Sequence, residues 1–346
     1  MRTSLVSLIS NRLIIITIVL FWLYVGQTFF IPLAFALLFT VTLSPIAAYL
    51  ERKKFPRIIA CMLIVLVFIS LSGLVIFFLF SEAMRILQDV PTIQLKLRQL
   101  VINVIDDIEA FSGLPLKANL EFDRLADDSV KNIAGWMVNS LSTVGSGLVI
   151  FTITPLYMFF MLYYRGLLKK VLNARFTGDS LLKINNIFAL SEMAIRNYLI
   201  GTFLMVIVCA VLSMIVLSIF GVEYAFFFSI LLAILNLIPY IGNFIGFIII
   251  LIFYYLSNES VSATFFLLMV MYISNLIQEN LIRPFLVGSK MEINAMAVLL
   301  ALVAGGYMWG FSGMIIFIPV VGILKILLEN DKTLKPFSLF FGSDQS

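Results

Sequence analysis

Residues 225–256, AFFFSILLAILNLIPYIGNFIGFIIILIFYYL, form an apolar stretch that is interrupted in the middle by turn-forming and polar residues. Each half is only about 14–17 residues long, whereas a helix that crosses a bilayer needs about 20. The pattern therefore predicts a broken helical hairpin. It is either re-entrant, turning back within the membrane, or its turn is an ordinary loop at the membrane surface. The candidate substrate-pathway residues at this break are Asn236, Pro239, Tyr240, Gly242, Asn243 and Gly246.

A second apolar stretch, residues 293–328, is broken in the same way by the glycine-rich segment 305–313, GGYMWGFSG. In both stretches a Leu-Leu-Ala triplet begins eleven residues before a glycine, which is Gly242 in the first and Gly310 in the second. Each stretch also follows a full-length apolar run. The sequence thus predicts a repeat of one span plus one hairpin. Its second copy adds Gly305, Gly306 and Gly310 to the candidate pathway residues.

The composition indicates a membrane protein. Of the 346 residues, 62% are hydrophobic and 12% are charged, against roughly 45–50% and about 25% in soluble domains. A soluble globule cannot hide so much apolar surface, which also argues against a nucleic-acid-binding protein. The long runs rich in Phe, Leu and Ile favour helices over an outer-membrane barrel. We expect an all-α polytopic membrane protein with about six full spans besides the two hairpins.

The charges along the chain predict its orientation. Loop 51–57 holds four basic residues and one acid, and segment 165–196 holds six basic residues and two acids. Region 82–143 instead holds six basic and nine acidic residues, and its apolar residues recur at helical spacing. By the positive-inside rule, the two basic segments and both termini are cytoplasmic, and 82–143 is an extracytoplasmic, amphipathic helical insertion. The span of the first repeat then runs outward and that of the second inward, which predicts an inverted repeat.

These boundaries divide the chain into six parts. We expect three N-terminal spans in 1–81, the insertion in 82–143, a fourth span with the basic segment in 144–197, the two repeats in 198–256 and 257–330, and a cytoplasmic tail in 331–346.

A polar stripe marks the run NLIQENLIRP, residues 275–284. Asn275, Gln278, Glu279 and Arg283 are three or four residues apart, so a helix places them on one face, and Glu279 precedes Arg283 in the order that favours an ion pair. An ionisable residue in a membrane segment is a functional candidate by default. The alternative is that the ion pair only anchors the cytoplasmic end of the helix. Asn280 and Pro284 complete the candidate set.

The motifs NLIPYIG (236–242) and NLIQENLIRP (275–284), together with the glycine-rich C-terminal hairpin, resemble the autoinducer-2 exporter family of PerM-like permeases. The resemblance covers almost the whole chain. It implies a transporter of the bacterial inner membrane that exports the quorum-sensing signal autoinducer-2. It also implies a homo-oligomer, for which the family suggests a pentamer. Some relatives are implicated in sodium/proton antiport, so the substrate does not follow from the resemblance.

We therefore expect a secondary transporter that exports a small polar molecule by alternating access, with autoinducer-2 as the first candidate. A monovalent cation (sodium)/proton antiporter in which Glu279 titrates and an oligomeric channel are the alternatives. The chain has no histidine and no phosphate-binding GxxxxGK[ST] loop, so ATP hydrolysis and the common nucleophile–base pairs are excluded. No enzymatic activity, cofactor, metal site or nucleic-acid partner is expected.

Overall fold

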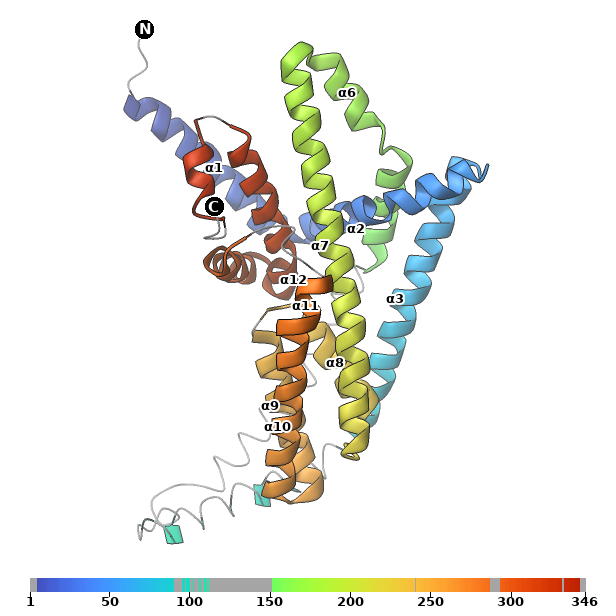
Figure 1. Cartoon of the computed structure of the whole chain (residues 1–346), viewed down its shortest axis with the longest axis vertical. Coiled ribbons are helices and arrows are strands. Elements are labelled where there is room, and N and C mark those ends of the chain that lie inside the picture. Colours follow the sequence, from blue (N-terminus) through green and yellow to red (C-terminus); the bar gives the residue numbers. More distant parts are fainter. Residues whose placement is uncertain are drawn as a thin grey trace. The chain divides into compact units, whose positions relative to one another are not determined.

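The structure is a computed structural model that describes residues 5–89, 151–239, 241–286, 293–331 and 333–342, with scattered residues between 95 and 112. The chain divides into two compact units, each described by itself below. The first comprises residues 1–69, 150–204 and 284–346, and the second comprises 70–149 and 205–283. In the described ranges every regular element is a helix (Figure 1).

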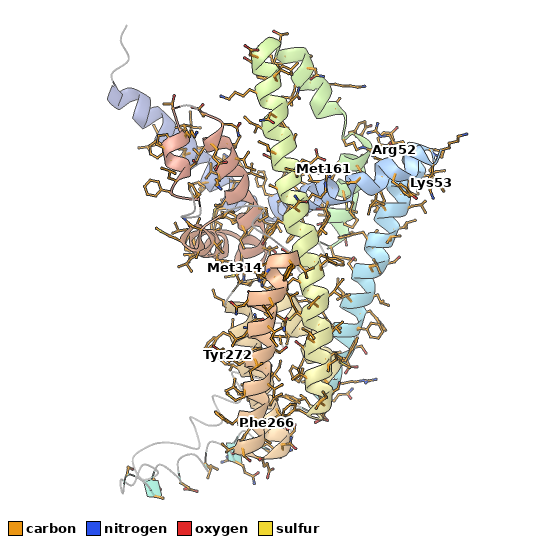
Figure 2. All side chains as sticks on the ribbon, viewed as in Figure 1. Arg52, Lys53, Met161, Phe266, Tyr272 and Met314 are labelled. Carbon is orange, nitrogen blue, oxygen red and sulfur yellow. The ribbon has the colours of Figure 1, made fainter. Side chains whose placement is uncertain are left out.

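In the part of the chain that the structure describes, six helices are long and apolar enough to cross a membrane, which confirms a multi-pass, helical membrane protein. They are α2 (Gln27–Arg52), α3 (Arg57–Gln88), α7 (Gly178–Ile219), α9 (Ile241–Asn258), the continuous α10, η1 and α11 (Val261–Leu286), and α12 (Ala295–Glu329). Shorter apolar helices cover 13–25 in α1 (Leu5–Val25), 151–163, and α8 (Ala225–Leu235). Large apolar side chains such as Phe266 and Tyr272 stand on the surface of α10, as suits a helix in contact with lipid or other subunits (Figure 2).

In the first unit, α1 and α2 are joined at Gly26, where the sequence predicts a tight turn. A Cβ atom at Gly26 would lie 2.9 Å from the carbonyl oxygen of Trp22. Helix α2 continues through Pro45, which cannot donate to the carbonyl of Val41. The Ser44 hydroxyl donates to that carbonyl instead, at 3.1 Å. This replacement allows a proline inside an apolar helix, where water cannot satisfy the freed carbonyl.

Helix α7 runs unbroken for 42 residues. It therefore passes through the expected boundary between the basic segment and the span at 197/198. No glycine or proline stands between Asp179 and Ile200 to end the helix, and the pair Glu192–Arg196, one turn apart at 2.8 Å, supports its polar part. The basic segment is thus largely a helical extension of the fifth apolar run, preceded by the short helix α6 (Leu167–Arg175).

The predicted insertion 82–143 starts inside a helix, because α3 continues to Gln88. Just beyond it, Asp89 accepts a hydrogen bond from the hydroxyl of Tyr224, which precedes α8. This bond, with burial, raises the pKa of Tyr224 to about 12. The prediction for the insertion as a whole concerns residues that lie mostly outside the described ranges.

In the second unit, α8 packs against α9, and α9 packs against α10 (Figure 1). Their shared core includes Phe228, Leu232, Ile250, Leu267 and Met271, all less than 5% exposed. Helix α10 begins at Ser260, whose hydroxyl accepts a hydrogen bond from the backbone N–H of Ala263. Such a cap satisfies one of the free amides at a helix start.

Both broken stretches are helical hairpins. The first has a non-helical turn at 236–240 between an 11-residue α8 and an 18-residue α9. Helix α8 is too short to cross a bilayer, whereas α9, at ~27 Å, nearly matches the ~30 Å hydrocarbon core. The expected length of about 14–17 residues for each half is therefore wrong for this hairpin, whose helices have 11 and 18 residues. In the second, Trp309 and Gly310 leave helical geometry within α12, inside the predicted break 305–313.

Candidate functional site

Three asparagines from different parts of the second unit form one hydrogen-bonded cluster. The Asn243 side chain, in the first turn of α9, donates to the side-chain oxygens of Asn236 (3.1 Å) and Asn275 (2.7 Å). Asn236 and Asn243 are 5% and 8% exposed. A buried amide without partners is costly, so Asn243 stabilises the positions of Asn236 and Asn275.

The turn reaches this position because two glycines allow close packing. A Cβ atom at Gly242 would lie 1.7 Å from the carbonyl oxygen of Leu235, at the end of α8. A Cβ atom at Gly246 would lie 2.4 Å from a methyl group of Leu232. Only glycine permits such an approach of two backbones. The start of α9 can therefore lie directly against the end of α8, with Asn243 facing Asn236.

The predicted ion pair is present, and one hydrogen bond accompanies it. Arg283 Nε lies 2.6 Å from Glu279 Oε2, and Arg283 Nη2 donates to Glu279 Oε1 at 2.8 Å. Arg283 Nη2 also donates to Asn236 Oδ1 at 3.3 Å. Asn236 thus joins the ion pair to the asparagine cluster. The combined group, which we call the amide–ion cluster, consists of Asn236, Asn243, Asn275, Glu279 and Arg283.

The stripe is carried by an irregular helix. Residues Gln278–Ile282 form the π-helical segment η1, in which Arg283 N–H bonds to Gln278 O, five residues earlier. Pro284 follows and cannot donate to the carbonyl of Asn280. We attribute the π turn to this proline. Such bulges often occur at functional sites, because they redirect side chains relative to a regular helix.

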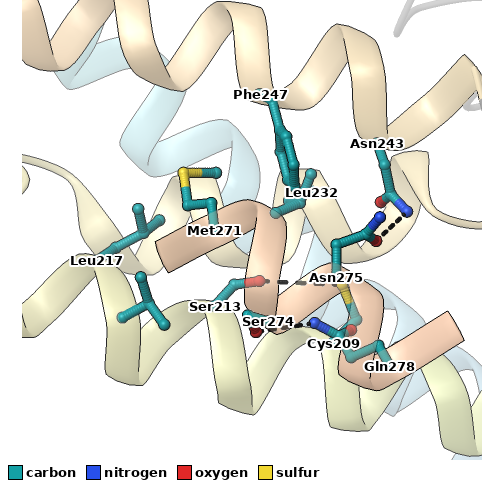
Figure 3. Close-up of a pocket in the computed structure, with 11 residues that line it drawn as sticks. Cys209, Ser213, Leu217, Leu232, Asn243, Phe247, Met271, Ser274, Asn275 and Gln278 are labelled. Carbon is teal, nitrogen blue, oxygen red and sulfur yellow. Dashed lines mark hydrogen bonds between the residues drawn. The ribbon is translucent and has the colours of Figure 1, made fainter. Parts of the chain in front are cut away.

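A small cavity lies beside the amide–ion cluster (Figure 3). Its volume of about 10 Å³ is close to what one water molecule needs. Gln278, 4% exposed, donates to the hydroxyl of Ser274 at 3.2 Å, and its side-chain oxygen is buried with no partner in the described part of the chain. The lining residues are Cys209, Ser213, Val216, Leu217, Leu232, Asn243, Phe247, Met271, Ser274, Asn275 and Gln278.

The sequence reasoning missed Ser213 and Ser274 as polar lining. Ser274 stands four residues before Gln278, so the helical spacing that revealed the stripe could have included it. Ser213 stands between Leu212 and Met214 in an apolar span and gives no comparable signal. Both cysteines, Cys61 and Cys209, are buried and free, and Cys209 lies 3.9 Å from the Ser213 hydroxyl.

Several predicted pathway residues are not members of the amide–ion cluster. The Asn280 side chain is exposed and donates to the backbone oxygen of Leu276 at 3.0 Å. Pro239 forms part of the turn, where its carbonyl accepts from Ile241 N–H, and Tyr240 lies outside the described residues. The remaining candidates, Pro284, Gly305, Gly306 and Gly310, belong to the first unit.

The second hairpin turns through backbone contact. A Cβ atom at Gly305 would lie 2.4 Å from the Gly313 carbonyl oxygen, and one at Gly313 would lie 2.0 Å from the Gly305 oxygen. Gly310 has φ +58° and ψ −139°, a conformation that only glycine adopts readily. Trp309 Nε1 donates to the carbonyl of Leu23 in α1 at 2.9 Å, so the turn is tied to the N-terminal helix.

The sequence is similar to known proteins over most of its length. The family described as AI-2E family transporter matches residues 13–332. YrrI of Bacillus subtilis (strain 168) is 26% identical over 323 residues, which are 89% of this chain and 88% of that protein. The AI-2 transport protein TqsA of Escherichia coli (strain K12) is 22% identical over 307 residues, 86% of this chain and 85% of that protein. With a match over nearly its entire length, the chain belongs to the AI-2E transporter family.

Proposed function

We propose that this transporter is a secondary carrier of the bacterial inner membrane that exports a small polar molecule, with autoinducer-2 as the first candidate. The observation that carries the proposal is the amide–ion cluster, in which buried amides, a carboxylate and a guanidinium are joined in one network. The name of the relative TqsA, an AI-2 transport protein, supports the choice of substrate.

The chemistry of the cluster suits a polyhydroxylated ligand. Asparagine and glutamine side chains offer both donors and acceptors, and the paired Glu279 and Arg283 add an acceptor and a donor with no net charge. A substrate hydroxyl can replace each internal hydrogen bond when the hairpin turn and η1 separate. The cavity beside Gln278 is too small for such a ligand in this conformation, so binding requires that movement.

Alternating access would follow from the inverted repeat. In this proposal the hairpin at 225–256 enters from outside and the one at 293–328 from the cytoplasm, with both termini cytoplasmic and 82–143 outside. The charge bias of the loops supports this orientation. Because α9 is nearly long enough to cross, the first turn would lie beyond the bilayer centre, level with Arg283. We propose a homo-oligomer, for which a pentamer is the candidate.

Sodium/proton antiport is the second candidate, and Glu279 favours it. This carboxylate is the acidic member of the amide–ion cluster, and protonation would weaken its ion pair with Arg283. Loss of the bond would free Arg283 and, through it, Asn236. An exchanged cation could then bind the deprotonated carboxylate and the amide oxygens.

The deciding experiment is flux into liposomes that contain the purified full-length protein, comparing autoinducer-2 with sodium under an imposed pH gradient. The export proposal expects saturable autoinducer-2 flux that Glu279→Gln reduces. The control is Glu192→Gln, which removes the other Glu–Arg pair of the same spacing and should leave flux unchanged. Sodium flux alone would establish the antiporter, and non-saturating flux of either solute would indicate a channel.

A further inference from the structure

The turn between α2 and α3 concentrates positive charge. Arg52, Lys53, Lys54 and Arg57 lie within six residues and are all exposed. The carboxylate that accompanies them, Glu51, is already bound, because Arg165 Nη2 lies 2.5 Å from Glu51 Oε2. The first turn of α3 contains no acidic residue. Arg57 shares Glu51 with Arg165, whereas Arg52, Lys53 and Lys54 have no ion pair in the described part of the chain. The turn therefore keeps a net positive charge, and the labelled Arg52 and Lys53 stand at its surface in Figure 2.

Internal contacts hold these cations in a defined arrangement. Lys53 lies over the ring of Tyr49, with 5.0 Å between its ammonium and the ring centre. Arg57 lies over the ring of Tyr163 at 5.5 Å, and its Nε is 4.0 Å from Glu51 Oε1. Cation–π contacts restrict the cations but do not neutralise them. The charges are thus positioned for an external anion.

Exposed apolar side chains continue directly from this charged turn along α3. Ile58, Ile59 and Met62 are 50%, 43% and 49% exposed, and Phe55, within the turn, is 42% exposed. An inorganic anion or a soluble phosphate ester would gain nothing from this apolar surface. A ligand with both an anionic head and hydrocarbon chains would contact both parts.

We propose that this surface, the basic turn (Arg52, Lys53, Lys54 and Arg57), binds the headgroup of an anionic phospholipid. The phosphodiester of an anionic phospholipid carries a negative charge. A zwitterionic lipid differs, because an ammonium group in the same headgroup compensates that charge. The acyl chains lie along the exposed face of α3. Basic residues next to membrane helices attract anionic lipids in this way. The inference is independent of the transported substrate.

The test measures lipid binding to the purified full-length protein in detergent by native mass spectrometry, with phosphatidylglycerol and phosphatidylcholine as the probes. We expect phosphatidylglycerol to bind the wild type in preference to phosphatidylcholine. The triple substitution Arg52→Gln, Lys53→Gln and Lys54→Gln should lower the affinity for phosphatidylglycerol roughly tenfold or more. The variant Lys53→Arg/Lys54→Arg, which keeps the charge, should bind as the wild type does.

A matched control removes the same charge elsewhere in the first unit. Lys170→Gln, Lys183→Gln and Lys335→Gln change three exposed lysines and should leave phosphatidylglycerol binding unchanged. An equal loss in this control would show that total charge, and not the basic turn, attracts the lipid, and would overturn the proposal. Equal binding of the two lipids to the wild type, or displacement of phosphatidylglycerol by excess inorganic phosphate, would overturn it as well. A thermal unfolding curve confirms that each variant is folded.

Discussion

The two hairpins differ in the form of their turns and in their chemistry. In the first, the turn 236–240 carries a buried asparagine that belongs to the amide–ion cluster. In the second, the turn is a change of direction at Trp309 and Gly310, held by contact between Gly305 and Gly313. The repeated sequence pattern therefore reflects the shared need for close backbone packing, and the polar chemistry is concentrated in the first hairpin.

Two glycines that occupy corresponding positions in the repeated sequence pattern have different roles. Gly242, the glycine eleven residues after the first Leu-Leu-Ala, faces the Leu235 carbonyl. Gly310, its counterpart in the second copy, has open space around the position of a Cβ atom and instead supplies a positive φ. Gly305 and Gly313 provide the close packing there. Similar spacing of residues thus does not imply a similar role for the glycines.

The largest expected difference between the hairpins is the side of the membrane from which each one enters the bilayer. In a variant with Cys61→Ala and Cys209→Ala, we place single cysteines at Asn258, after the first hairpin, and at Thr333, after the second. A membrane-impermeant maleimide should label position 258 in intact cells and position 333 only after the membrane is opened. Labelling of both positions from the same side would refute the inverted repeat.

The next largest effect should follow from loss of the amide bridge. Asn243→Ala removes two hydrogen bonds and leaves the oxygens of Asn236 and Asn275 without this donor. Because Asn243 would no longer hold two members of the proposed substrate site, transport in liposomes should fall about tenfold to a hundredfold, which corresponds to about 1–3 kcal/mol in the activation free energy of transport. The control Asn280→Ala changes an asparagine that bonds only its own helix. If both variants transport at the wild-type rate, the amide–ion cluster is an anchor and not a substrate site.

A third comparison tests the close backbone packing in both hairpins, with the unfolding temperature of the protein as the measured quantity. Gly242→Ala and Gly305→Ala each add a methyl group less than 2.5 Å from a backbone oxygen, and overpacking of this kind costs about 1–3 kcal/mol. Both should lower the unfolding temperature in detergent. Gly166→Ala, whose added methyl group meets no atom within 4 Å, is the control. An unchanged unfolding temperature for Gly242→Ala would contradict the described contact of α8 with α9.

The smallest effect is expected at the tie between the second hairpin and α1. Trp309→Phe keeps the aromatic ring and removes the bond to the Leu23 carbonyl, which should lower the free energy of unfolding by about 1 kcal/mol. Transport should stay within twofold of the wild type, because the amide–ion cluster is untouched. A loss of transport as large as that of Asn243→Ala would show that the second hairpin also carries functional chemistry.

The sequence by itself determined the membrane class, the helices and the Glu279–Arg283 pair. These features depend on composition, on the length of apolar runs and on contacts one helical turn apart, all of which are local. The break in each hairpin could be predicted for the same reason, since proline and glycine act on the backbone where they stand.

Only the tertiary structure decided which polar residues meet. Asn236 and Arg283 are 47 positions apart, and Asn243 and Asn275 are 32 positions apart. Their contacts depend on how α9 and α10 are rotated against each other, which the packing of the core around Ile250 and Met271 sets. The selection of Asn236 over Asn280 as a cluster member, and the inclusion of Ser213 beside Gln278, follow from this packing. A polar residue in an apolar helix must find a partner, but its own sequence neighbourhood does not specify which helix provides it.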